Sequence, residues 1–231
     1  MGKKTLFISV ILFILSLIFF ENTNTDFYIQ DQLYSFELKT WIFKDPTRIY
    51  HLIFYKLIKV PIYIIGFYAL FKVIRGKIKK QPFESYRSFL IVFLTLAILP
   101  TSIATIGKKS INVQCPSDIY RYGGKVPYVK LFEPYPPNPN RPDGKWPPGN
   151  CWPAGHASGG FALLSLYVLA RNKKEKLLSI IVALGFGTAM SVYQMVRGAH
   201  YISHQIDTLL LALIVISFLN IIIKNPGGSH D

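Results

Sequence analysis

Long blocks of apolar residues, separated by shorter polar segments, dominate the chain. Six of these blocks are about 16 to 20 residues long. At ~1.5 Å per helical residue, such a length crosses, or nearly crosses, ~30 Å of hydrocarbon. The blocks are Thr5–Phe20, Leu57–Val73, Phe89–Ile106, Trp152–Ala170, Leu177–Val196 and Ile206–Ile223. The pattern predicts an all-α fold, a polytopic membrane bundle of about six transmembrane helices.

The basic residues predict the orientation of this bundle. Short segments rich in Lys and Arg stay on the cytoplasmic side, and every second connection is basic, at Lys3, Lys4, Arg75, Lys77, Lys79, Lys80, Arg171, Lys173, Lys174, Lys176 and Lys224. Both termini are therefore expected inside. The outer segments would be Glu21–His51, Gly107–Cys151 and Arg197–Gln205.

The first block lacks a small-x-small cleavage site in the residues that follow it, so we expect an uncleaved helix. The aromatic and acidic stretch 27–45 after it suits a helix lying at the membrane interface or an ordinary loop, and both remain open. A proline-rich stretch, Glu133–Gly149, excludes regular helix or strand. We expect residues 1–231 to form a single transmembrane domain with an outer loop at 107–151.

Composition and charge narrow the class of protein. The chain is 51% hydrophobic and carries a formal net charge of +14, but its basic residues gather at the ends of apolar blocks, where anionic lipid headgroups are the nearer partner. Nucleic acid is not an expected partner, and no obligate protein partner is inferred. Cys115 and Cys151, the only two cysteines, share one outer segment and are predicted to form a disulfide, the alternative being two free thiols.

Three of the five histidines, His156, His200 and His204, fall at the outer ends of predicted spans four and six. Ionisable residues at membrane depth are costly and are candidates for function. Interfacial histidines bonded to water or backbone would be the ordinary alternative for any one of them. Three on one side, together with basic residues, favour a site.

The sequence P-A-G-H, Pro153 to His156, stands directly before an apolar block. Proline suits the first turn of a helix, and the amides that follow it lack intrahelical partners. Such an end attracts anions, and Gly155 permits close approach of a phosphate oxygen. A plain helix start is the alternative.

A second cluster runs from Gln194 to Asp207. If the chain is helical from His200 onward, His204 and Asp207 follow on the same face and would orient the ring of His200. A neutral, oriented imidazole is a competent nucleophile, and Arg197 would bind phosphate oxygens. A third cluster, at the end of span three, offers Lys109 and Arg121, although exposed basic residues at a membrane surface are more often solvated.

Taken in sequence order, with Lys109 and Arg121 first, Pro153 to His156 second and Gln194 to Asp207 third, these clusters resemble the type 2 phosphatidic acid phosphatase (PAP2) superfamily, whose pattern reads K-x6-R-P, P-S-G-H and S-R-x5-H-x3-D. The resemblance covers Lys109 to Asp207 and the six-span topology. Ala154 replaces the serine of the second motif, and Pro116 follows Lys109 at the position of the Arg-Pro pair.

In the third motif, Gln194 stands where the arginine is expected and His204 where the aspartate is expected. Arg197 is then the substitute for the missing guanidinium. For the first motif Arg121 and Arg141 are the alternatives, of which Arg121 is favoured because Arg141 lies in the proline-rich stretch.

The resemblance implies a lipid phosphatase that uses a phosphohistidine. His200 would be the nucleophile and His156 the general acid, with Lys109, Arg121, Arg197 and Gly155 holding the phosphoryl oxygens and Asp207 orienting. It implies no metal and no cofactor.

The substrate would be lipid A, an isoprenyl phosphate or a glycerophospholipid phosphate, met at the periplasmic face of a bacterial inner membrane. A lipid A phosphatase is the first candidate if the cell is Gram-negative. The alternatives are a lipid phosphotransferase with the same intermediate, and a metal-dependent membrane hydrolase or transporter in which His156, His200 and His204 hold zinc.

Overall fold

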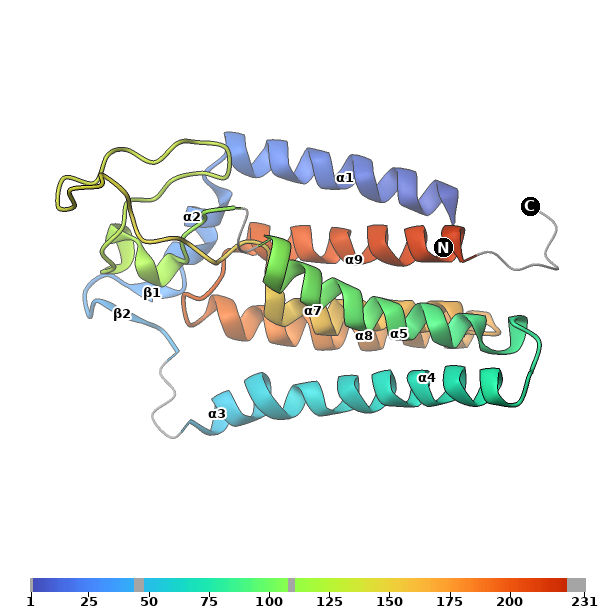
Figure 1. Cartoon of the computed structure of the whole chain (residues 1–231). Helices are drawn as coiled ribbons and strands as arrows, with labels where there is room; N and C mark the ends of the chain where they lie inside the picture. Colours follow the sequence, from blue (N-terminus) through green and yellow to red (C-terminus); the bar gives the residue numbers. More distant parts are fainter. Residues whose placement is uncertain (1, 44–47, 108–110, 224–231) are drawn as a thin grey trace.

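The computed structural model describes residues 2–43, 48–107 and 111–223. It consists of long helices running back and forth, with one short hairpin (Figure 1). Lys109 and Lys224, both named in the sequence predictions, lie outside the described residues. The predicted all-α bundle is confirmed.

Among the described residues, five helices are long and apolar enough to cross a membrane, which makes the chain an integral membrane protein. Their outward-facing residues are strongly apolar: the side chain of Phe7 is 66% exposed and that of Phe67 is 71% exposed. Surfaces of this kind suit lipid rather than water. Three of the five helices are α1 (Lys3–Asn22), α8 (Lys173–Met195) and α9 (Ile202–Ile222). The other two are longer than the labelled helix within them: the helix Ile49–Ile78 ends in α4 (Val60–Ile78), and the helix Glu84–Thr105 contains α5 (Glu84–Ser102).

The second predicted span is longer than its apolar block. The helix already begins at Ile49 as α3 (Ile49–His51), continues through one π-helical segment, η1 (Leu52–Lys56), and one 3-10 turn, η2 (Leu57–Lys59), and then becomes α4. Phe54 stacks on Tyr193 of α8 with ring centroids 5.8 Å apart. This packing extends the helix outward beyond the predicted boundary at Leu57.

The fourth predicted span is shorter than expected. The helix covers only α7 (Gly155–Ala162) and the 3-10 segment η6 (Leu163–Val168). The residues before it are held to α9, because the backbone N–H of Ala154 donates to Thr208 Oγ1 at 2.9 Å. The helix therefore begins after these contacts rather than at Trp152.

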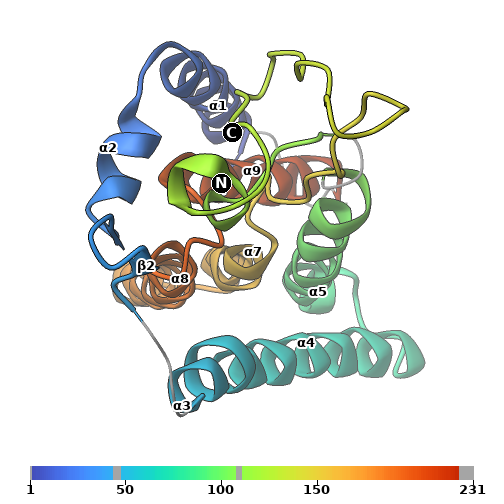
Figure 2. The ribbon, with the colours of Figure 1, turned by 90° about the vertical axis from the view of Figure 1, so that its left-hand side faces the viewer.

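The helices alternate in direction, so that α1 begins and α9 ends at the same end of the bundle (Figure 1). The basic connections α4–α5 and α7–α8 lie at that end too. In the end view, α9 runs through the interior, with α1 on one side of it and α7 and α8 on the other, while α4 lies at the edge (Figure 2). Helix α9 contacts α1, α5, α7 and α8.

Helices α7 and α8 approach one another closely at two glycines. A Cβ atom placed on Gly160 would lie 2.6 Å from the backbone of Gly187. Any larger residue at either position would force these helices apart. The close approach fixes the second turn of α7 against α8.

The opposite end of the bundle is covered by the outer segments. After α1 come a short helix, α2 (Thr25–Asp31), and an antiparallel pair of two-residue strands, β1 (Tyr34–Ser35) and β2 (Thr40–Trp41). The stretch expected to be an interface helix or a loop thus combines a short helix with a hairpin. Between α5 and α7 lie the η3 turn (Ile103–Gly107) and two 3-10 turns, η4 (Pro116–Asp118) and η5 (Tyr120–Tyr122).

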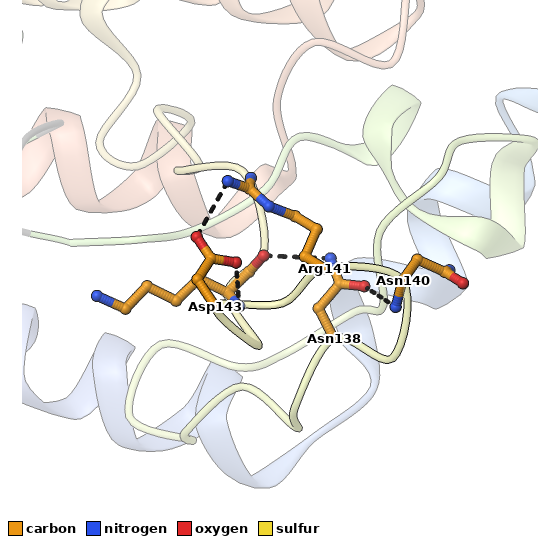
Figure 3. A network of polar contacts seen from close by, with 5 residues as sticks. Asn138, Asn140, Arg141 and Asp143 are labelled. Carbon is orange, nitrogen blue, oxygen red and sulfur yellow. Dashed lines mark hydrogen bonds and ion pairs between the residues drawn. The ribbon is translucent and has the colours of Figure 1, made fainter.

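The proline-rich stretch has no regular structure, as predicted, and is closed by its own polar contacts (Figure 3). Arg141 forms an ion pair with Asp143 at 3.1 Å, and Asn138 Oδ1 accepts a hydrogen bond from the N–H of Asn140 at 3.0 Å. Arg141 is therefore held within its own loop.

Candidate active site

Cys151, His200 and His204 form a buried cluster at the N-terminal end of α9. Their exposed fractions are 0%, 6% and 3%. Nδ1 of His200 lies 3.3 Å from Nδ1 of His204 and 3.5 Å from Sγ of Cys151. The structure thus brings together two of the three predicted catalytic histidines and adds a sulfur atom.

The turn before α9 sets the position of His200. Gly198 adopts a positive φ of 71°, which glycine reaches without strain, and a Cβ there would lie 2.2 Å from the indole ring of Trp41. Helix α9 begins only at Ile202. His200 therefore lies outside the helix, whereas the sequence prediction had it helical from His200 onward.

The N-terminus of α9 is held by Asp26 of α2. Its carboxylate accepts hydrogen bonds from the backbone N–H of Ser203 at 3.0 Å and from Ser203 Oγ at 2.6 Å. A carboxylate at this end satisfies unpaired helix amides and complements the helix dipole. Burial nevertheless raises the pKa of Asp26 from 3.8 to about 6, against the lowering effect of these hydrogen bonds. Asp26 was not identified from the sequence.

Asp207, predicted to orient His200, has other hydrogen-bond partners. One carboxylate oxygen accepts from Ser16 Oγ of α1 at 2.7 Å, and the other accepts from Trp152 Nε1 at 2.8 Å. These bonds join α1, α9 and the segment before α7. The contact on His200 Nδ1 comes from His204 instead.

His156 and Gly155 lie in the first turn of α7. The ring of His156 stacks on Tyr55 with centroids 3.9 Å apart, and the other neighbour of Tyr55 is His51, at 4.5 Å. His156 and Gly155 line a largely apolar cavity of about 390 Å³ between α4, α5 and α7, with Lys59 also in its wall. The cavity joins the predicted general acid to the lipid-facing side of the bundle.

Arg197 lines a second hollow, of about 360 Å³, with Arg48, His51 and Tyr193. Nη1 of Arg197 lies 3.3 Å from the hydroxyl oxygen of Tyr193 and 3.5 Å from Nδ1 of His51. Two guanidinium groups and an imidazole around one hollow would attract an anion. Through His51, this hollow adjoins the ring stack that ends at His156.

His51, Arg48 and Tyr55 were missed by the sequence reasoning. His51 and Tyr55 are four positions apart at the start of a helix, which places them on one face. That spacing could have predicted a shared helix face, but the predicted span began later, at Leu57. Both residues were therefore assigned to the outer loop and to the short segment between this loop and the span.

Arg121, predicted to bind phosphate, is paired elsewhere. It donates two hydrogen bonds to the carboxylate of Asp31, one of them from Nε at 2.8 Å, and its guanidinium lies over the ring of Phe27. This guanidinium holds the pKa of Asp31 below its ordinary value. The pair ties η5 to α2, so Arg121 acts as a structural link. Lys109, which was predicted together with Arg121 to bind phosphate, lies outside the described residues.

Cys115 and Cys151 form a disulfide. It joins the segment at η4 to the segment before α7, so the cluster of Lys109 and Arg121 is covalently connected to the P-A-G-H segment. Cys151 also belongs to the group of potential metal ligands with His200 and His204, whose donor atoms lie within 4.8 Å of one another. The three-histidine zinc site considered from the sequence differs from this group, because His156 stacks on Tyr55.

Comparisons with known proteins identify the family of this fold and site. The family profile described as PAP2 superfamily matches residues 86–226, more than half of the chain, and includes all three histidines. The comparisons with curated proteins and with solved structures gave no match. Phosphatase and phosphotransferase chemistry on lipid-like phosphates belongs to this superfamily. The chain is a member of the PAP2 superfamily of membrane phosphatases.

Proposed function

We propose that the protein hydrolyses the phosphate ester of a membrane lipid through a phosphohistidine on His200. The observation that carries this proposal is the adjacency of an anion-attracting hollow at Arg197 to a ring stack that ends at His156. The acid–base group and the phosphate-binding group therefore belong to one connected region. The lipid-facing cavity reaches the same His156.

His200 acts as the nucleophile through Nε2. Its Nδ1 lies 3.3 Å from Nδ1 of His204, and in the tautomer in which His200 carries its proton on Nδ1 and donates it to His204, the lone pair of His200 is on Nε2. His204 thus performs the orienting role that an aspartate performs in the family pattern. A neutral imidazole orients the ring but stabilises a positive charge on it less than a carboxylate would.

The reaction has two balanced steps. Nε2 of His200 attacks phosphorus, the bond to the lipid oxygen breaks, and His156 gives its proton to that oxygen. Water then attacks phosphorus, His156 takes a proton from it, and phosphate leaves His200. Arg197 and Arg48, with the backbone amides at the start of α7, stabilise the charge on the phosphoryl oxygens.

The substrate is a lipid with an exposed phosphate: lipid A, an isoprenyl phosphate or a glycerophospholipid phosphate. The apolar walls of the cavity at His156 suit an acyl or prenyl chain. The basic residues at the C-terminal end of α4 and at the start of α8 support an orientation in which the end of the bundle away from the histidines is cytoplasmic. In this orientation the site would face the periplasm of a bacterial inner membrane, with membrane lipids as its surroundings.

Purified protein in detergent, incubated with each lipid class, tests the proposal by release of inorganic phosphate and by mass spectrometry of the lipid product. We expect one class to be dephosphorylated and His200→Ala to remove both the activity and an acid-labile, base-stable phosphoryl label. Arg197→Lys should lose most activity, because a point charge does not reproduce a bidentate fork. Arg141→Lys is the matched control and should retain activity. Full activity in His200→Ala would refute the mechanism, and phosphate appearing on a second lipid would identify a phosphotransferase.

A further inference from the structure

The spacing of Cys151, His200 and His204 matches the edges of a tetrahedral metal site. Two imidazole nitrogens bound to one zinc ion lie ~3.3 Å apart, and a bound nitrogen and thiolate sulfur lie ~3.6 Å apart. The two nitrogens here are 3.3 Å apart, and the sulfur is 3.5 Å from His200 Nδ1. The third edge is within 4.8 Å. Two of the three edges therefore need almost no adjustment.

In the disulfide with Cys115, the sulfur of Cys151 is not available as a metal ligand. Zinc binds cysteine as the thiolate, and a disulfide sulfur carries no such charge. With the bond intact, the cluster offers two nitrogens only. With the bond reduced, it would offer an N,N,S set with one open position, as in three-ligand zinc sites.

We propose that reduction of the Cys115–Cys151 disulfide creates a zinc site from Cys151, His200 and His204. A dithiol reductant supplies the two electrons and two protons that convert the disulfide to two thiols, and is itself oxidised to a disulfide. Zn²⁺ then binds Nδ1 of each histidine, and the proton that His200 carried on Nδ1 moves through solvent to its Nε2. The metal also displaces the proton of the Cys151 thiol, which leaves to solvent. Cys115 keeps its thiol.

One neighbour competes with the metal. Sγ of Cys151 lies 2.8 Å from the carbonyl oxygen of Ala199, which would accept a hydrogen bond from a protonated thiol. Zinc must therefore displace that proton, and its binding should strengthen with rising pH.

A consequence for catalysis rests on the proposed function. A zinc ion on Nδ1 of His200 replaces the hydrogen bond between His200 and His204, leaves a proton on Nε2 of His200 and withdraws electron density from the ring. The nucleophile is thereby inhibited, so the reduced protein would be a phosphatase that zinc switches off. Metal binding itself does not depend on this consequence.

Cobalt(II) is the probe, because a thiolate ligand gives it a near-ultraviolet charge-transfer band. Full-length protein is reduced anaerobically with dithiothreitol, freed of reductant, and titrated beside the untreated disulfide form. We expect about one cobalt per reduced chain, with the thiolate band. The disulfide form should lack the band and bind at least ~100-fold more weakly. Absence of the band after complete reduction would overturn the proposal.

Single variants separate this site from adventitious binding. Cys115→Ser leaves the Cys151 thiol without its disulfide partner and should bind cobalt with no reductant, whereas Cys151→Ser should never show the band. His204→Ala should weaken binding, and His51→Ala, a histidine outside the cluster, should not. Equal losses in His204→Ala and His51→Ala would contradict the assignment. If Cys115→Ser fails to fold, the reduced wild-type protein decides the question.

Phosphate release is measured separately. Zinc should inhibit the reduced protein and not the disulfide form. Cobalt binding without any loss of activity would uphold the metal site and count against His200 as the nucleophile. Cobalt binding in a protein that hydrolyses no lipid phosphate would uphold the site and reject the proposed function.

Discussion

The ring of Tyr55 lies nearly parallel to the imidazole of His156, with centroids 3.9 Å apart and an interplanar angle of 19°. Tyr55 also stacks on His51, and Nζ of Lys59 lies 4.4 Å from its centroid. The helix Ile49–Ile78 therefore holds the orientation of a histidine that belongs to α7. The proposed general acid depends on two helices that are distant in sequence.

Replacing Tyr55 should affect catalysis through the position of His156. Aromatic stacking contributes about 0.5–1.5 kcal/mol, so Tyr55→Leu should lower kcat by up to ~10-fold. Tyr55→Phe keeps the ring and should stay within ~2-fold of wild type. Steady-state kinetics over a range of pH provides the measurement. The alkaline limb of the pH profile, which is assigned to the general acid His156, should move in Tyr55→Leu only. Unchanged profiles in both variants would refute a positioning role for Tyr55.

Arg121 should contribute to stability rather than to phosphate binding. Its pair with Asp31 is partly exposed, the arginine side chain being 45% accessible, and such pairs contribute about 0.2–1 kcal/mol. Contact with the ring of Phe27 adds roughly 0.5–1 kcal/mol. Arg121→Ala should therefore lower the unfolding free energy by about 1–2 kcal/mol and leave KM unchanged.

A double-mutant cycle of Arg121→Ala and Asp31→Ala, followed by thermal unfolding in detergent, measures the coupling. The double variant should be less destabilised than the two single changes combined. An increase in KM in Arg121→Ala with no loss of stability would restore the phosphate-binding role predicted from the sequence.

The helices were predictable because lipid imposes a simple requirement. A spanning segment must satisfy every backbone hydrogen bond internally and present apolar side chains, so α1, α5, α8 and α9 follow the apolar blocks closely. The fourth block does not follow this requirement. Its helix packs in the centre of the bundle against α5, α8 and α9, and contacts with these neighbours hold it in place. The length of this helix could therefore not be predicted from hydropathy.

The partners of polar residues were the least predictable feature. Asp207 bonds to Ser16, 191 positions away, and Arg121 bonds to Asp31, 90 positions away. Helical periodicity reports only residues three or four apart. The His200–His204 pair falls in that range and was identified, whereas Asp207 was assigned to the nearest histidine for want of any signal from α1.

The turn at Gly198 should tolerate no side chain. Ala in a left-handed conformation costs about 1–2 kcal/mol, and the new methyl group would collide with Trp41, at 2.2 Å. Gly198→Ala should lower stability by roughly 2–4 kcal/mol and displace His200. Gly144→Ala is the matched control, since Gly144 also has a positive φ, 61°, but nothing within 4 Å of its Cβ position. Thermal unfolding should show a small loss for Gly144→Ala, and equal losses would contradict the clash.

Removing the carboxylate of Asp207 should loosen the contact between α1 and α9. Asp207→Ala leaves the donors of Trp152 and Ser16 without their acceptor, which costs about 2–4 kcal/mol for two buried groups. Ser16→Ala should cost about 1 kcal/mol. Unfolding and phosphate-release assays are compared on the same samples. A large fall in kcat in Asp207→Asn, with stability unchanged, would favour the orienting role that the sequence suggested.

Asp26 should make stability depend on pH in the acid to neutral range. Folding raises the pKa of the Asp26 carboxyl group from 3.8 to about 6. The folded state therefore binds this proton more tightly than the unfolded state does. The resulting stabilisation is complete below pH 3.8 and is lost as the pH rises through 6. A shift of this size corresponds to at most about 3 kcal/mol.

Asp26→Asn removes the ionisation but keeps a side-chain oxygen that accepts from the backbone N–H of Ser203. The wild-type melting temperature in detergent should fall between pH 4 and pH 7, because ionisation of the buried carboxyl group becomes unfavourable, and the variant should be flatter over that range. Asp207, whose charge also raises the pKa of Asp26, serves as the second test: Asp207→Asn should reduce the pH dependence without abolishing it. Identical pH profiles for wild type and Asp26→Asn would show that another group controls the stability of this end of α9.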